Sequence, residues 1–213
     1  MSLPNRIIWD FNGTIFDDVQ VGIDSANELL KRYNLPIMPD RDCYYKVFGF
    51  PIIDYYRRLG FDFTKLDYTV LAHEWVEIYN KLVKNAAVRS GLIETVNELK
   101  TLGIKQTVMS MTEEKMLIRQ LDELKIRNMF DEVYGLSDIY ANSKLALAEG
   151  WRRSHPDENV IFVGDTLHDA ESAKVIGCKC YLISGGHQSD EVLYQSNNEI
   201  ISSPYEILEL IKK

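Results

Sequence analysis

Short apolar runs recur along the chain, separated by helical periods or polar turns. They are rich in β-branched and aromatic residues and lack a clean alternation of polar and apolar positions, which is typical of strands buried on both faces of a parallel sheet. The runs are residues 6–9, 104–109, 132–134, 160–163 and 180–183. Each run is predicted to be a strand of one parallel sheet.

Helical patterns lie between these runs. An apolar stripe over residues 92–102 ends at Gly103, a typical C′ glycine, and predicts one helix. After the second run, Thr112 is predicted to be an N-cap, with Glu113 and Glu114 in the first turn of the next helix. Strand and helix alternate in this way to the end of the chain, which indicates a doubly wound, Rossmann-like α/β core with a parallel sheet.

The character of the sequence changes between residues 17 and 87, where helical stripes occur without a strand-like run. The stripes are Ile23, Ala26, Leu30 and Tyr33, then Ile52, Tyr55, Tyr56 and Leu59, then Leu71, Trp75, Ile78, Tyr79 and Leu82. We interpret residues 17–87 as an all-helical cap domain inserted into a core of residues 1–16 and 88–213. The predicted hinges are residues 15–18 and 85–91.

Charge and composition limit the classes of partner. The net charge of −8 disfavours nucleic acid and anionic lipid, which bind through basic surfaces. The chain contains no stretch of 18 apolar residues, the length that a membrane span needs. The first apolar run is too short for a secretory signal. The three cysteines, Cys43, Cys178 and Cys180, match no zinc or redox template. We therefore expect a cytoplasmic protein without nucleic-acid or membrane partners.

Polar residues follow the predicted strands at the edge of the sheet where ligands usually bind. They are Asp10, Asn12, Gly13 and Thr14 after the first run, Ser110 after the second, and Asp165 and Asp169 after the fourth, with Lys144 at the start of a helix just before it. Taken singly, such residues are commonly turn formers, helix caps or solvated charges. Together they place a nucleophilic carboxylate, two further acids, a hydroxyl and an ammonium at one edge.

The chain resembles the haloacid dehalogenase superfamily over essentially its whole length. Four motifs of that family occur in order. Residues 7–14 match an apolar strand followed by Asp-x-Asp-Gly-Thr, except at Asn12, and residues 107–110 match a strand followed by Ser or Thr. Lys144 is the third motif, and residues 160–169 match Gly-Asp-x-x-x-Asp after a strand. The insertion resembles the helical cap of the phosphoglycolate phosphatase-like branch.

The resemblance implies a Mg²⁺-dependent phosphoric monoester hydrolase that acts on a small phosphorylated metabolite. Asp10 would attack phosphorus and become a transient aspartyl phosphate. Mg²⁺ prefers hard oxygen ligands, which suits the acids of this set. The implied catalytic residues are Asp10, Asn12, Ser110 and Lys144; the phosphate-binding residues are Asp10, Thr14, Ser110, Met111 and Lys144; and the metal-binding residues are Asp10, Asn12 through its carbonyl, Asp165 and Asp169.

Asn12 departs from the phosphatase pattern of the family, in which an Asp here protonates the leaving group and then activates water. An amide cannot do this, and loss of the acid/base carboxyl group lowers the rate by roughly 10²–10⁴-fold for a poor leaving group. Because the two side chains are nearly isosteric, Asn12→Asp is expected to restore a proton donor with little other disturbance, and to raise turnover of alkyl phosphates most.

Three interpretations of Asn12 stay open. A weak phosphatase could act on acyl or aryl phosphates, whose leaving groups need little protonation. Another acid/base could replace the missing one: His168, whose alternative reading is an exposed helix residue, or Arg41 or Lys46 of the cap. The chain could also be a catalytically weak protein that binds a phosphorylated ligand and signals by cap closure.

Two related chemistries fit less well. The metal-free dehalogenases do not preserve the acid that Asp165 supplies here, and phosphonoacetaldehyde hydrolases need a cap lysine that residues 49–53 lack. The substrate is not readable, because the pattern does not tell which cap residues face the site. The candidates are Arg41, Lys46, Tyr55, Arg57 and Arg58. The oligomeric state is left open as well.

Overall fold

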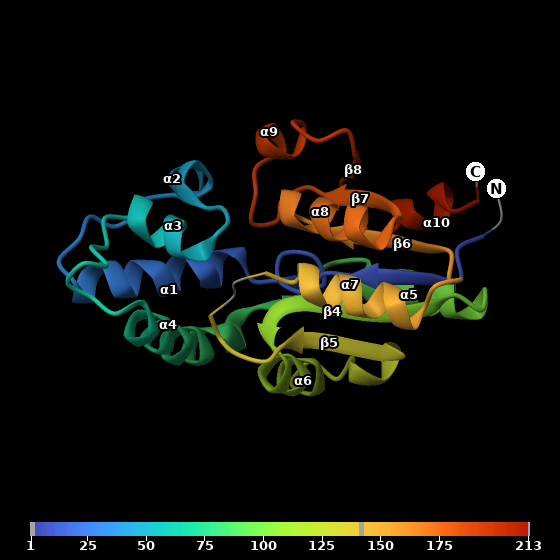
Figure 1. The fold of residues 1–213 in the computed structure, drawn as a ribbon, viewed down its shortest axis with the longest axis horizontal. Helices are drawn as coiled ribbons and strands as arrows, with labels where there is room; N and C mark the ends of the chain where they lie inside the picture. Colours follow the sequence, from blue (N-terminus) through green and yellow to red (C-terminus); the bar gives the residue numbers. More distant parts are fainter. Residues whose placement is uncertain (1–2, 141–142, 213) are drawn as a thin grey trace.

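Six parallel strands form the central sheet of the computed structural model, which describes residues 3–140 and 143–212 (Figure 1). The strands of this sheet are β1 Arg6–Trp9, β4 Lys105–Glu113, β5 Glu132–Leu136, β6 Val160–Gly164, β7 Lys179–Ile183 and β8 Glu199–Ile201. Their order across the sheet is β5-β4-β1-β6-β7-β8. The predicted doubly wound α/β core is confirmed, and β1 lies between the two strands that carry the second and fourth motifs.

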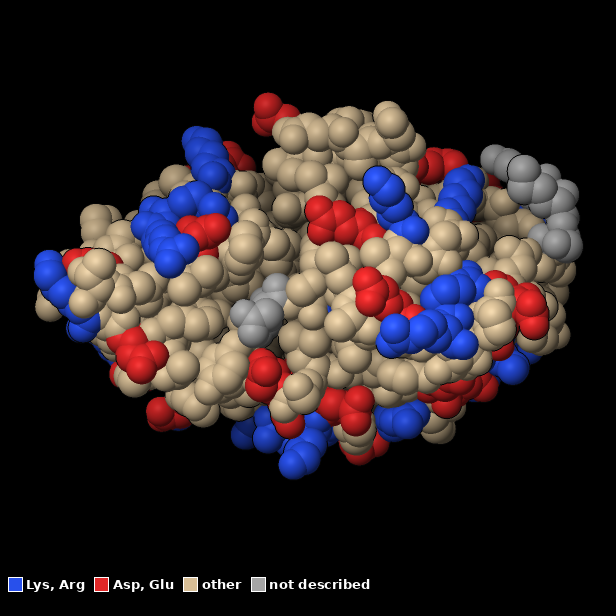
Figure 2. All heavy atoms as spheres, viewed as in Figure 1, with Lys and Arg blue, Asp and Glu red and all other residues tan. Residues whose placement is uncertain are grey.

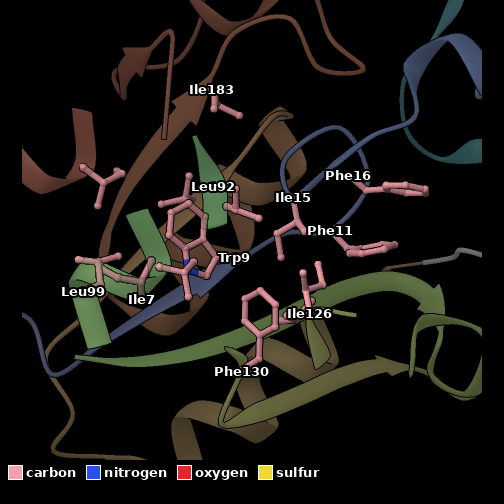
Figure 3. Packing of buried hydrophobic residues seen from close by; sticks show 14 of the residues in the cluster. Ile7, Trp9, Phe11, Ile15, Phe16, Leu92, Leu99, Ile126, Phe130 and Ile183 are labelled. Atoms are coloured by element: carbon pink, nitrogen blue, oxygen red, sulfur yellow. The ribbon is translucent and has the colours of Figure 1, made fainter. Parts of the chain in front are cut away.

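Helices cover both faces of this sheet, because alternate side chains of each strand point to opposite faces. The core helices are α5 Leu92–Thr101, α6 Glu114–Glu123, α7 Leu145–Ser154, α8 Leu167–Ile176, α9 Asp190–Leu193 and α10 Glu206–Leu210, with a 3₁₀ turn at Arg127–Met129. Ile7 and Trp9 lie in one buried cluster with Leu92 and Leu99 of α5 (Figure 3). Ile8 lies in a second cluster with residues of α7 and α8. Burial of each such side chain contributes roughly 1.5–3 kcal/mol, which holds β1 in its register.

The second strand continues beyond its apolar run. β4 extends to Glu113 because its end pairs with Leu136 of β5 after a shift in register. The expectation that Thr112 caps the following helix is therefore wrong. Glu113 is the N-cap of α6, and its carboxylate accepts a hydrogen bond from the backbone N–H of Met116 at 2.8 Å.

The last strand lies outside the predicted runs. β8 has only three residues and pairs with β7 at the edge of the sheet, so its sequence is too short to show a period.

Within residues 3–140 and 143–212, no helix has both the length and the apolar character needed to cross a membrane.

Residues 17–87 hold a group of helices that lies to the left of the sheet in Figure 1. They are α1 Val19–Arg32, α2 Arg41–Val47, α3 Ile52–Arg58 and α4 Tyr68–Leu82, followed by a 3₁₀ turn at Val83–Asn85. These helices share a buried cluster of their own, which includes Leu29, Tyr55 and Leu71. β2 Phe16–Asp17 pairs antiparallel with β3 Ala87–Val88, so the two connections to the core run side by side. The division into cap and core domains stays a prediction, which this packing favours.

Candidate functional site

The loop that follows β1 carries Asp10 and is built around one backbone carbonyl. The carbonyl oxygen of Phe11 accepts hydrogen bonds from three following backbone N–H groups at 2.9–3.3 Å. Gly13 has φ 73°, and a Cβ atom at this position would lie 2.2 Å from a carboxylate oxygen of Asp165. Only glycine combines this backbone conformation with so close an approach. The turn therefore brings the end of β1 against the end of β6.

Three carboxylates and one ammonium meet at this point. Carboxylate oxygens of Asp10, Asp165 and Asp169 lie within 4.8 Å of one another, and all three side chains are buried. The ammonium of Lys144, at the N-cap of α7, forms an ion pair with Asp10 and lies 2.5 Å from Oδ1 of Asp169. The structure thus gathers four of the predicted site residues. Their chemical roles stay predictions.

The charges of this cluster do not balance. Burial raises the pKa of Asp10 well above its ordinary value; Lys144 opposes this, and Asp169 and Asp165 add to it. Burial also raises the pKa of Asp165 to about 6, although His187 acts in the opposite direction. Burial by itself lowers the pKa of Lys144, but the neighbouring carboxylates outweigh it and raise that pKa. One ammonium does not offset three buried carboxylates, so the cluster favours a further cation.

Hydrogen bonds orient two of the acids. The hydroxyl of Thr14 donates to Oδ1 of Asp165 at 3.0 Å, and the backbone N–H of His187 donates to Oδ2 at 2.6 Å. Oδ2 of Asp169 accepts from the backbone N–H groups of Asp165 and Thr166 at 3.1 and 2.9 Å, and from the Thr166 hydroxyl at 2.7 Å. Thr14 thus contacts Asp165 and is not among the described residues that line the cavity. The part of Thr14 in phosphate binding stays a prediction.

A cavity of about 170 Å³ lies over the cluster, between the ends of the strands and the cap helices. The predicted site residues that line it are Asp10, Asn12, Ser110, Met111, Lys144, Asp165 and Asp169. Ser110 is buried, and its Oγ accepts a hydrogen bond from the backbone N–H of Thr112 at 3.0 Å. The cavity can therefore hold a small ligand against the carboxylates.

Asn12 is held in one orientation by three neighbours. Its Nδ2 donates to Oδ2 of Asp18 at 2.7 Å and to the hydroxyl of Tyr79 at 3.1 Å, and its Oδ1 accepts from the hydroxyl of Thr112 at 2.7 Å. The carboxylate on one side and the hydroxyl donor on the other assign the amide nitrogen and oxygen. The expectation that Asn12→Asp causes little other disturbance is wrong, because the new carboxylate would meet that of Asp18.

Asp18 is a residue of the site that the sequence reasoning missed. It is 1% exposed and also accepts hydrogen bonds from the backbone N–H of Gly13 at 2.9 Å and the hydroxyl of Tyr79 at 2.6 Å. Burial by itself raises the pKa of Asp18, but His187 and the hydrogen bonds outweigh it and lower that pKa below its ordinary value. Asp18 therefore remains ionised. Its place beside the first motif is the signal that could have found it.

His187 is the second missed residue. Its Nε2 donates to Oδ1 of Asp18 at 3.3 Å, and its Nδ1 forms a hydrogen bond of 2.6 Å with the hydroxyl of Tyr44 in α2. Burial lowers the pKa of His187, but Asp18 and Asp165 raise it, and the net change is upward. His187 follows the strand that ends at Ile183, so the search of polar residues after strands could have included it.

The structure corrects one of the two readings of His168, that of an exposed helix residue, while its role as a replacement acid/base stays a prediction. His168 is 7% exposed, not an exposed helix residue, and its ring lies 5.0 Å from the ring of Phe50. The backbone N–H of Lys144 donates to Nε2 at 3.3 Å, so this nitrogen carries no proton, and Nδ1 donates to Glu171 at 2.9 Å. His168 also lines the cavity.

The basic residues of the cap lie away from the cavity. Arg41, Lys46, Arg57 and Arg58 are exposed, and none is among the described residues that line the cavity. Figure 2 shows basic side chains on the outer surface over α2 and α3. Of the predicted substrate-contact candidates, only Tyr55 lines the cavity.

Comparison with known proteins places this architecture in a family. The family model of haloacid dehalogenase-like hydrolases matches residues 7–183. The chain belongs to this family. A phosphoglycolate phosphatase of Pseudomonas syringae pv. syringae is 24% identical over 211 residues, which span 93% of this chain and 76% of that protein. The resemblance to the phosphoglycolate phosphatase-like branch is confirmed.

Solved structures are similar over the whole chain. The haloacid dehalogenase-like hydrolase family protein SP0104 from Streptococcus pneumoniae has a TM-score of 0.78 at 21% identity, covering 97% of this chain and 98% of that one. Protein Tyrosine Kinase A (PtkA) of Mycobacterium tuberculosis has a TM-score of 0.82 at 18% identity, covering 100% of both chains. At these identities the likeness shows the fold.

The donor set of this haloacid dehalogenase-like hydrolase fits Mg²⁺. Asp10, Asp165 and Asp169 offer hard carboxylate oxygens at the same point, and the unbalanced negative charge calls for a compact cation. A Cβ atom at position 164 would lie 2.2 Å from Cγ of Asp169, so Gly164 is needed for the backbone to pass this close. The carbonyl of Asn12 as a further ligand stays a prediction.

Mg²⁺ is expected to stabilise this haloacid dehalogenase-like hydrolase much more at about pH 8 than at about pH 5. A carboxylate must be deprotonated to bind metal, and the pKa of Asp165 is raised to about 6. Because this pKa lies above its ordinary value, protonation of Asp165 stabilises the metal-free fold, and that contribution is lost as the pH rises through about 6. Tm in Mg²⁺ and in EDTA measures the difference. An equal Mg²⁺ shift at both pH values would contradict the assignment, and Asp165→Asn should reduce the shift.

Proposed function

We propose that the protein is a Mg²⁺-dependent phosphatase that hydrolyses a small phosphomonoester through an aspartyl phosphate on Asp10. The observation that carries this proposal is the buried carboxylate of Asp10 at the floor of the cavity, paired with Lys144 and next to two further acids. An in-line phosphoryl transfer depends mostly on positioning and charge neutralisation, and this arrangement offers both.

In the first step the carboxylate of Asp10 attacks phosphorus, and the bond between phosphorus and the ester oxygen breaks with its electron pair on that oxygen. The ammonium of Lys144 and the hydroxyl of Ser110 would hold the transferring phosphoryl oxygens. A bound Mg²⁺ would supply positive charge next to the phosphate and reduce repulsion among the carboxylates. In the second step a water oxygen attacks phosphorus, the bond from phosphorus to the carboxylate oxygen of Asp10 breaks, and the proton of the water passes to the phosphate or to solvent. This step releases inorganic phosphate and restores the carboxylate of Asp10.

Known relatives support phosphoester chemistry at this site. The relative from Pseudomonas syringae pv. syringae is named a phosphoglycolate phosphatase. This chain belongs to the haloacid dehalogenase-like hydrolases. A tyrosine-protein kinase, PtkA of Mycobacterium tuberculosis, is also similar, at 22% identity over 210 residues. A phosphatase and a kinase both transfer a phosphoryl group, which is the chemistry that we propose here. The size of the cavity restricts it to small esters.

Phosphate release from a panel of small phosphomonoesters, in Mg²⁺ and in EDTA, tests this proposal. We expect release in Mg²⁺ that falls to the uncatalysed level in EDTA. Mass spectrometry of residue 12 accompanies the assay, because an Asn-Gly sequence deamidates and a fraction converted to Asp would imitate activity. Failure to release phosphate from any ester in Mg²⁺ would contradict the proposal.

The second candidate function is binding of a phosphorylated ligand without turnover. The observation that favours it is the fixed amide of Asn12, whose nitrogen is directed to Asp18 and Tyr79. Titration calorimetry with the same esters distinguishes the two functions, because a binding protein would show a stable heat of association and no phosphate release.

A further inference from the structure

The wall that the cap contributes to the cavity is mainly aromatic and aliphatic. Phe50, Tyr55, Trp75 and Tyr79 line it from α3, α4 and the loop before α3. Phe50 belongs to none of the buried apolar clusters of the described residues, although its ring lies against that of His168. Its other aromatic neighbour is Phe48, at 5.7 Å between ring centroids, so Phe50 lies at the border between the cap cluster and the cavity. A flat apolar group in the cavity would contact these rings.

The charges around the cavity disfavour a second anionic group on a ligand. Five carboxylates line it, those of Asp10, Asp18, Glu113, Asp165 and Asp169. Among the described residues that line the cavity, Lys144 is the one lysine or arginine, and it is already paired with two of these acids. His187, whose pKa is raised, also lines the cavity, but its ring is already paired with Asp18. A second phosphate or a carboxylate would therefore be buried without an unpaired cation, which is strongly unfavourable.

Asn12 limits the leaving group independently of the walls. The amide of Asn12 cannot protonate the departing oxygen. Its hydrogen bonds to Asp18 and Thr112 hold the side chain in place, so that it does not move aside for another proton donor. An oxygen that leaves without a proton donor must be stable as an anion. A phenol has a pKa of about 10, far below that of an alkyl alcohol, so a phenolate leaves where an alkoxide does not.

The size of the cavity and one hydroxyl narrow the ligand further. A cavity of about 150 Å³ lined by apolar side chains holds a benzene ring, so a cavity of about 170 Å³ that also takes the phosphate has room for no more than one ring. Tyr55 lines this cavity and is 4% exposed, and its hydroxyl is buried with no hydrogen-bond partner among the described residues. Buried hydroxyls are normally paired, so a polar substituent that reached Tyr55 would supply a partner that the described residues do not.

We propose that the substrate is an aryl phosphate with a single ring, carrying a neutral hydrogen-bonding substituent that Tyr55 binds and no second anionic group. This inference rests on the proposed phosphatase function and names its substrate class. Asp10 forms the bond to phosphorus, the bond from phosphorus to the phenolic oxygen breaks, and the electron pair leaves on the phenolate, which takes a proton from solvent. Water then releases phosphate from Asp10.

Four matched esters test the substrate class in Mg²⁺. Cyclohexyl phosphate has the size of phenyl phosphate with a poor leaving group, and 4-carboxyphenyl phosphate has the size of 4-carbamoylphenyl phosphate with an additional charge. We expect kcat/KM for the carbamoyl ester to exceed that for the carboxy ester by about tenfold or more, because the carboxylate is buried unpaired. We expect phenyl phosphate to exceed cyclohexyl phosphate by roughly 10²-fold. A preference for the carboxy or the cyclohexyl ester would overturn the inference.

Tyr55→Phe tests the hydroxyl. The ratio of kcat/KM for the carbamoyl ester to that for phenyl phosphate should fall about five- to tenfold, the usual effect of losing one hydrogen bond. Tyr33→Phe is the matched control, since it removes a cap tyrosine hydroxyl that does not line the cavity, and it should leave the ratio unchanged. An unchanged ratio in Tyr55→Phe would overturn the role of Tyr55.

Binding to the Asp10→Asn variant separates this inference from the proposed function. If no ester is hydrolysed, the phosphatase proposal fails, while titration calorimetry still compares the carbamoyl and carboxy esters in the same cavity. Tighter binding of the carbamoyl ester would support the ligand class, and tighter binding of the carboxy ester would overturn it. Hydrolysis with the opposite preference would overturn the inference and leave the phosphatase proposal standing.

Discussion

Replacing Asp10 with asparagine is expected to lower kcat for every phosphomonoester by at least about 10³-fold, because the covalent nucleophile is removed. The fold should persist. Burial already raises the pKa of Asp10 well above its ordinary value, so a neutral isostere is tolerated in the metal-free protein. Lys144 keeps Asp169 as an ionic partner. Phosphate release in Mg²⁺ and Tm in EDTA, measured on the same preparation, check both parts.

The matched control is Asp17→Asn. Asp17 is exposed, follows the same loop and does not line the cavity, so its replacement should leave phosphate release unchanged. Turnover by Asp10→Asn near the parent rate would exclude Asp10 as the nucleophile. A large fall in Tm of the metal-free variant would instead mean that the ionised form of Asp10 holds the fold together.

Exchange of the two side chains in the Asn12–Asp18 pair is the second change with a large expected effect. In the double variant N12D/D18N the hydrogen bonds can reverse. The amide now at position 18 donates to the carboxylate at position 12, Tyr79 donates to that same carboxylate, and the amide oxygen still accepts from Gly13. A carboxylate then stands where the family has its acid/base. We expect kcat for alkyl phosphates to rise roughly 10²-fold, and far less for aryl phosphates, whose leaving groups need little protonation.

The single variant N12D serves as the control, because it places a half-buried carboxylate at position 12 in contact with the buried carboxylate of Asp18. The pKa of one of them must rise strongly, and the free energy of unfolding should fall by about 1–3 kcal/mol at neutral pH. The double variant should recover most of this loss. Chemical denaturation and kcat on phenyl and cyclohexyl phosphate measure both effects. Equal stability and equal kcat of the single and double variants would show that the Asn12–Asp18 contact does not determine which side chain position 12 tolerates.

The arrangement of the sheet and its acids could be predicted from the sequence for a simple reason. Residues that directly follow parallel strands gather at one edge, so Asp10 and Asp165 were bound to meet once the runs before them were recognised as neighbouring strands. Lys144 opens a helix beside the same edge, and it pairs with the acids there. Local pattern is sufficient here because strand ends and helix starts are local features.

Surroundings that depend on long-range packing were decided only by the tertiary structure. Asn12 meets Tyr79, which is 67 residues away, and Asp18 meets His187, which is 169 residues away, because the cap folds back over the core. Helical periodicity marks which residues share a face, but not which neighbour that face meets, so it does not distinguish Tyr55 in the cavity from Arg58 on the outer surface. Local patterns in the sequence were therefore enough to place the acids of the candidate site, while packing of residues 17–87 against the rest of the chain set what a ligand would contact.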